Sequence, residues 1–174
     1  MLAPVRMSES PNHQELRQLL DVRRTLASES DYERLLERVL EDGRAITGAR
    51  YAALGVLDQD RVGLERFLTS GVDPVTRDAI GEPPRGRGVL GVLISDPRPL
   101  RLANVAEHPS RYGFPAGHPR MRSFLGVPIM IGGEVWGNLY FAEKEDAREF
   151  SEADEQAAVV LAECAAEAIE NVNE

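Results

Sequence analysis

The chain has 174 residues, of which 43% are apolar, and its formal net charge is −9. This length supports one domain with a substantial core, and the acidic balance argues against a nucleic acid or an anionic membrane surface as partner. Cys164 is the single cysteine, which excludes an intramolecular disulfide and a multi-cysteine zinc site. No apolar run approaches the roughly 18–20 residues of a membrane helix. We therefore expect a soluble, cytoplasmic protein.

Two helices are predicted at the start of the chain. Residues 1–12 are polar and contain prolines, which is typical of a disordered terminus. Leucines at helical spacing in residues 13–30 predict an N-terminal helical extension. Ser30 or Asp31 is the expected N-cap of the second helix, and Gly48 is placed to end it.

Strands and short helices are predicted next. Residues 50–58 and 63–71 favour two strands joined by a polar turn, because β-branched and apolar residues are bounded by turn formers. Short helices are expected at 73–80 and 85–96, and a short strand at 98–104. A loop over roughly 104–122 follows, and loops of that length in compact domains are often functional.

The clearest elements are in the last third of the chain. Residues 123–131 and 134–144 predict a β-hairpin that turns at Gly132-Gly133. The final helix is expected to begin after Ser151, which forms a capping-box pattern with Asp154. The order of elements indicates an α+β fold, in which helices lie on the faces of an antiparallel sheet.

Few catalytic patterns are present. The sequence has no G-x-x-x-x-G-K-[ST] phosphate loop, no G-x-S-x-G elbow and no H-E-x-x-H pair. Cys164 falls on the apolar stripe of the last helix, which favours a small buried side chain over a nucleophile. No acid/base constellation can be assembled from these residues, and we expect the protein not to be an enzyme.

The loop that ends in "GFPAGHPRMRSFLGVP" is the strongest candidate site. Its His118 lies between a glycine and a proline, among cationic and apolar side chains. The cationic residues are Arg111, Arg120 and Arg122, and the apolar ones are Phe114, Met121, Phe124 and Leu125. An imidazole beside an apolar slot with arginines at its mouth suits haem, because the iron takes a histidine nitrogen and the propionates need cations. The alternative is a loop histidine that makes only local hydrogen bonds.

Residues 31–172 resemble a GAF domain. The resemblance rests on the "LGVPI" strand, the "G-x-L-Y" strand and the helix that follows "FSEADE". Lys144, Phe150, Asp154 and Glu155 match the Asn-Lys-Phe-Asp-Glu signature of cyclic-nucleotide GAF domains, but Glu143 replaces its asparagine. The match therefore implies a structural Lys144–Asp154 ion pair, and leaves cyclic-nucleotide binding unsupported.

A narrower resemblance is to the first GAF domain of the DosS/DosT oxygen- and redox-sensing histidine kinases. "GRGVLGVLI", "PLRL", "GFPAGHPRMRSFLGVP" and "GNLYFAEK" carry it. It implies that haem b is the cofactor and that His118, in "H-P-x-M-R", is the proximal ligand of the iron. Tyr140, in "G-x-L-Y", would lie on the distal side and donate a hydrogen bond to bound O₂, NO or CO.

The GAF resemblance also implies an architecture and an output. A GAF domain at 31–174 would have a central sheet of about six strands, terminal helices on one face, and short helices and loops forming a ligand pocket on the other. The terminal helices would form a homodimer and signal to a histidine kinase or another partner, whether the chain is an excised domain or freestanding. The alternative is a haem-free GAF module for small-molecule binding or dimerisation. Free methionine sulfoxide reductase activity requires several cysteines, and bilin attachment does not suit Cys164.

Overall fold

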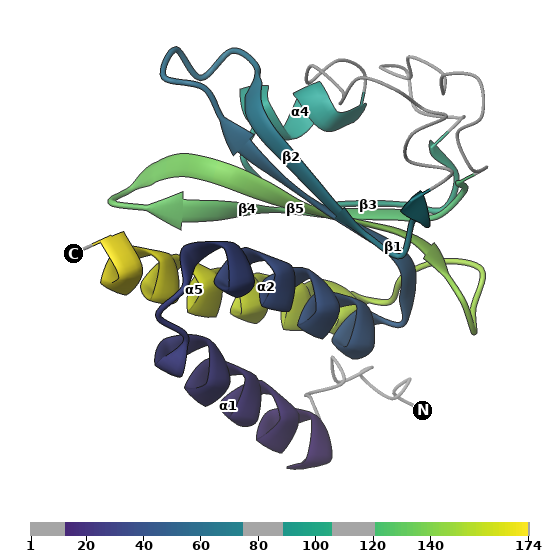
Figure 1. The fold of residues 1–174 in the computed structure, drawn as a ribbon. Coiled ribbons are helices and arrows are strands. Elements are labelled where there is room, and N and C mark those ends of the chain that lie inside the picture. Colours follow the sequence, from purple (N-terminus) through teal and green to yellow (C-terminus); the bar gives the residue numbers. More distant parts are fainter. Residues whose placement is uncertain (1–12, 75–88, 106–120, 174) are drawn as a thin grey trace, which may run out of the picture.

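The computed structural model describes residues 13–74, 89–105 and 121–173, which form helices packed on the two faces of one antiparallel sheet (Figure 1). The elements are α1 (His13–Ser28), α2 (Tyr32–Thr47), β1 (Ala49–Leu57), β2 (Leu64–Ser70), α4 (Val89–Ser95), β3 (Leu100–Leu102), β4 (Phe124–Ile131), β5 (Glu134–Lys144) and α5 (Glu152–Asn173). The short helix expected at 73–80 lies almost wholly outside the described residues. No helix within the described ranges is long and apolar enough to cross a membrane.

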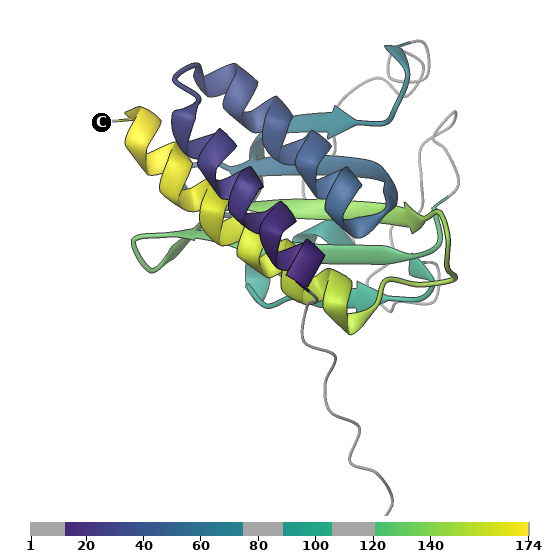
Figure 2. The same cartoon turned by 90° about the horizontal axis from the view of Figure 1, so that it is seen from below.

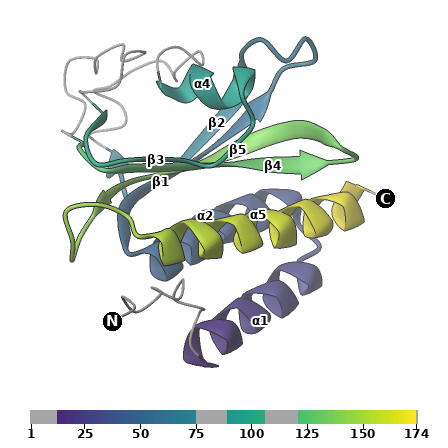
Figure 3. The same cartoon turned by 180° about the vertical axis from the view of Figure 1, so that it is seen from behind.

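The sheet has the strand order β2-β1-β5-β4-β3, with every neighbouring pair antiparallel. The α+β prediction is confirmed, although the described residues form five strands where about six were expected. Helices α2 and α5 cover one face of the sheet, and α4 lies over the other (Figure 3). Helix α1 packs on α5 and forms an additional outer layer, as the view from below shows (Figure 2).

The sequence signals for helix ends are confirmed. Asp31, rather than Ser30, caps α2, because its side chain accepts a hydrogen bond from the backbone N–H of Arg34. Gly48 ends the helix with a φ of 71°, in the left-handed region that glycine adopts without strain. At α5, Ser151 and Asp154 form the predicted capping box, with backbone-to-side-chain distances of 2.8 and 3.0 Å.

The predicted β4–β5 hairpin is also present. Gly132 and Gly133 occupy its two-residue turn with φ angles of 61° and 79°. Positive φ at both central residues is the geometry of the tight turn that matches the twist of the two strands. The register shifts by one residue between Ile129 and Met130, so the turn and this irregularity together set the pairing of Gly126 with Tyr140.

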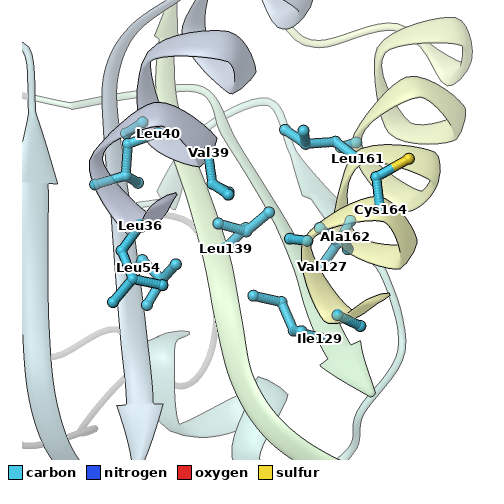
Figure 4. Close-up of a cluster of buried hydrophobic side chains, with 14 of the residues drawn as sticks. Leu36, Val39, Leu40, Leu54, Val127, Ile129, Leu139, Leu161, Ala162 and Cys164 are labelled. Atoms are coloured by element: carbon cyan, nitrogen blue, oxygen red, sulfur yellow. The ribbon is translucent and has the colours of Figure 1, made fainter. Parts of the chain in front are cut away.

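The main core lies between the sheet and the helices α2 and α5. Leu139 and Phe141 of β5 and Val127 of β4 are fully buried there, against helix residues such as Val39 and Leu161 (Figure 4). Because side chains alternate along a strand, Tyr140 and Phe124 belong to a second, smaller cluster on the opposite face. Each central strand therefore contributes to both faces of the sheet.

Candidate functional site

The candidate site is the face of the sheet that α4 covers, here called the α4 face. Leu93 of α4, Phe124 of β4 and Tyr140 of β5 are buried together on it. Partly buried apolar side chains from four segments pack around these three. They are Ala53, Phe67, Leu100, Leu102 and Val105. The described part of this face is thus an apolar surface built from one short helix and several strands.

Small residues flank Tyr140 on both neighbouring strands. Ala53 of β1 and Gly126 of β4 are its direct partners in the sheet. A Cβ added to Gly126 would come within 2.7 Å of the Leu93 side chain, so any other residue here would force Leu93 or the Phe124 ring to move. The Tyr140 ring lies between Phe67 and Phe124, at centroid distances of 6.3 and 6.2 Å. These separations are typical of tilted aromatic contacts.

The hydroxyl of Tyr140 is a buried polar group in this apolar setting. Tyr140 is 4% exposed, and among the described residues its hydroxyl has no hydrogen-bond partner. Burial raises the pKa of the phenol well above its ordinary value, and the neighbouring Asn138 side chain opposes this shift to a smaller extent. Asn138 is therefore close to the hydroxyl, but no hydrogen bond with normal geometry joins the two. The phenol remains neutral and available as a donor.

Asn138 is the second buried polar residue of the α4 face. It is fully buried, and neither its carbonyl oxygen nor its amide nitrogen has a hydrogen-bond partner within the described part of the chain. Most buried polar atoms in folded proteins are hydrogen-bonded, so such a residue in the middle of a sheet calls for an explanation. The sequence analysis did not single out Asn138. Its signal is an asparagine on the same face as Tyr140, in the run "GNLYFAEK" of a strand that is otherwise apolar at its centre.

The structure unites some of the residues predicted to bind the cofactor and separates others. Tyr140 and Phe124 lie together on the α4 face. Leu125 does not join them: it is fully buried on the opposite face, in the main core against the helices, because it alternates with Phe124 along β4. Leu125 therefore does not share the α4 face with Tyr140 and Phe124.

Two further predicted residues lie just before β4. Met121 is half-buried, and Arg122 is exposed. The backbone N–H of Arg122 donates a hydrogen bond to the carboxylate of Glu143. The backbone of Glu143 has a positive φ of 61°. The remaining predicted residues, His118, Phe114, Arg111 and Arg120, lie outside the described residues.

The predicted Lys144–Asp154 ion pair is present at the C-terminal end of β5. The Lys144 ammonium lies 3.1 Å from the Asp154 carboxylate and donates to the backbone carbonyl of Thr47 at 2.6 Å. Both charged side chains are largely buried, with 14% and 12% exposure. The pair ties together the end of α2, the end of β5 and the start of α5. These contacts give Lys144 a structural role on the far side of the sheet from Tyr140.

Comparison with known proteins agrees with this architecture. The family model described as GAF domain matches residues 29–170. The GAF domain of a phosphoenolpyruvate-protein phosphotransferase from Coxiella burnetii superposes with a TM-score of 0.77 at 23% identity, covering 91% of this chain and 94% of that one. A corresponding Acinetobacter domain gives 0.77 at 20% identity, with 94% and 96% covered.

A free methionine-R-sulfoxide reductase from Neisseria meningitidis, solved with its substrate, gives a TM-score of 0.73 at 19% identity, with 96% of each chain covered. At these identities the solved structures establish the fold and leave the ligand open. The family model covers most of the chain, including every strand of the sheet, the helices α2 and α4, and α5 as far as residue 170. The chain belongs to the GAF domain family.

Proposed function

We propose that this GAF domain, a small-molecule sensor or regulatory module, binds its ligand on the α4 face in contact with Tyr140, and that it is not an enzyme. The observation that carries the proposal is the buried Tyr140 hydroxyl, which lacks a partner among the described residues. A bound ligand supplies the missing acceptor, and the surrounding apolar cluster shields the contact from bulk water.

The ligand we propose is haem b. The described part of the α4 face fits the distal side of haem in two respects: it is apolar and aromatic, and it presents one neutral hydroxyl donor. The resemblance in "H-P-x-M-R" assigns the iron to His118, with Arg111, Arg120 and Arg122 as partners for the propionates. Haem supplies an iron that binds O₂, NO or CO or changes its redox state. Tyr140 then favours those ligands that accept its hydrogen bond, by about 0.5–1.5 kcal/mol.

Reconstitution with haemin tests this proposal. We expect the purified protein to take up one equivalent of haemin and to show a Soret band that His118→Ala shifts or abolishes. Tyr140→Phe should retain haem and should weaken O₂ binding more than CO binding. Leu125→Val serves as a matched control, because it alters the opposite face of the sheet and should leave the spectrum unchanged. A Soret band that is the same in wild type and His118→Ala would remove His118 as the ligand.

The second candidate is a haem-free module that binds another small molecule. Two observations favour it. The carboxamide of Asn138 requires a partner that can donate as well as accept, and Leu125 lies away from the proposed haem face. A colourless protein that takes up no added haemin, as wild type and as the His118→Ala and Tyr140→Phe variants, would favour this alternative over the haem sensor.

For the output we propose a homodimer formed through the terminal helices, signalling to a histidine kinase or another partner. Leu16 and Leu20 on α1 are 46% and 61% exposed, and Val160 on α5 is 37% exposed. Burial of these side chains against a second copy is favourable by about 25 cal/mol per Å² of apolar surface. Light scattering after size exclusion should give the mass of a dimer, and Leu20→Glu should reduce it to that of a monomer. Val62→Glu alters an even more exposed apolar side chain, 76% exposed in the β1–β2 turn, and should leave the mass unchanged.

A further inference from the structure

Two buried polar side chains occupy alternate positions of β5. Asn138 is 0% exposed and Tyr140 is 4% exposed, and their three polar side-chain atoms lack hydrogen-bond partners in the parts of the chain that the structure describes. A carboxamide has two N–H donors and a carbonyl acceptor, and a phenol has one donor and one acceptor. Even a hydrogen bond between the two residues would leave at least one donor and one acceptor unused.

Both side chains lie on the α4 face. Asn138 is paired directly with Gly55 of β1, and directly paired residues of antiparallel strands project to the same side of a sheet. A Cβ built on Gly55 would lie 3.2 Å from the Tyr140 ring and 2.9 Å from the Leu64 side chain, so Gly55 shares the face of Tyr140. The Leu64 side chain and the Tyr140 ring cover Gly55, so an apolar side chain and the phenol lie beside Asn138 on β1.

The burial of an unpaired carboxamide disfavours the folded state, and a leucine of similar size would avoid the penalty. Asn138 therefore contributes nothing to stability that an apolar residue could not provide. We propose that Asn138 is a second ligand-contacting residue, which forms one polar subsite with Tyr140 on the α4 face, and that this subsite selects a bound group able both to donate and to accept hydrogen bonds. The inference rests on the proposed function only in placing the ligand on this face.

The chemistry of the bound group follows from its surroundings. The clustered residues around the subsite are uncharged, and the phenol remains neutral, so a neutral group is favoured over an ion. A diatomic gas offers acceptors alone and cannot satisfy the carbonyl oxygen of Asn138. The group is therefore a water molecule, a hydroxyl or an amide edge. If haem is bound, Asn138 would hold a water molecule at this subsite.

The first test needs no haem. In ligand-free protein, Asn138→Leu should leave the midpoint of thermal unfolding unchanged or raise it. Thr47→Val is the matched control, because the buried Thr47 hydroxyl donates to the carbonyl of Gly43 at 2.7 Å. This change should lower the midpoint by about 2–4 °C. A midpoint of Asn138→Leu lowered as far as that of the control would show that Asn138 is satisfied within the fold, and would overturn the proposal.

The second test observes the subsite directly by NMR. The side-chain amide protons of Asn138, assigned by their loss in Asn138→Leu, should show nuclear Overhauser contacts to a bound water in the ligand-free protein. After haemin is added, they should show contacts to the retained water or to haem protons. The absence of contacts to water and to haem in both forms would refute the subsite. If no haemin is taken up, the haem proposal fails, while the water contacts still decide the role of Asn138.

Discussion

Replacement of Lys144 by methionine should destabilise the domain far more than the loss of a surface charge. The change keeps an unbranched side chain one atom shorter and removes the cation that lies 3.1 Å from Asp154. It leaves a carboxylate that is only 12% exposed without its counter-ion, and it removes the donor to the Thr47 carbonyl. Breaking one side of a buried ion pair costs about 3–5 kcal/mol. Asp154 still accepts from the backbone N–H of Ser151 at 2.8 Å, so we expect about 3 kcal/mol.

Arg23→Met provides the matched control. Arg23 lies 3.2 Å from Glu167, a distance almost equal to that of the buried pair, but the two side chains are 59% and 55% exposed. Exposed pairs contribute about 0–1 kcal/mol. In urea denaturation, Lys144→Met should lower the midpoint by about 1–2 M, and Arg23→Met should hardly move it. The double variant Lys144→Met/Asp154→Asn should be more stable than Lys144→Met alone, because the buried charge is gone. Equal losses in Lys144→Met and Arg23→Met would refute this account.

Three other predictions concern residues of the helices α2 and α5. Gly43→Ala should lower the free energy of unfolding by about 1–3 kcal/mol in urea titrations, despite the helix propensity of alanine, because the new Cβ would lie 2.5 Å from the Phe141 ring. Burial raises the pKa of Asp42, so the folded state binds its proton more tightly, and this group lowers stability as pH rises through its folded pKa. Asp42→Asn should therefore gain stability at pH 7 relative to wild type and lose that gain near pH 3; a gain that is equal at both pH values would contradict the assignment. Burial also raises the pKa of the Cys164 thiol. A chromogenic disulfide reagent should react with Cys164 at the rate of unfolding, and immediate reaction in native buffer would show that the thiol is accessible.

Local sequence signals predicted the elements that depend on local chemistry. The glycines at 132–133 specify their turn because both require positive φ, and Ser151 with Asp154 specifies the start of α5 through reciprocal hydrogen bonds. The Lys144–Asp154 pair followed from a family signature rather than from spacing, and the structure contains it. These features need no knowledge of how distant segments meet.

Features that depend on register could not be predicted in the same way. Leu125 and Phe124 are adjacent apolar residues, and only the pairing of β4 with β5 and the position of α5 decide which one faces the helices. Likewise, Asn138 appears unremarkable in a sequence until its pairing with Gly55 places it beside the Tyr140 phenol. The sequence shows that a residue is polar, but it does not show whether a hydrogen-bond partner lies near its side chain.

The alternation along β5 gives this strand an additional property. Tyr140 lies on the α4 face of the sheet. Its immediate neighbours in sequence, Leu139 and Phe141, pack against the helices on the opposite face. A tilt of the backbone at position 140 therefore displaces both neighbours at once, and α5 and the α1 that rests on it receive the movement. The shortest packed connection between the α4 face and the outermost helix thus runs through residue 140, its two neighbours and α5.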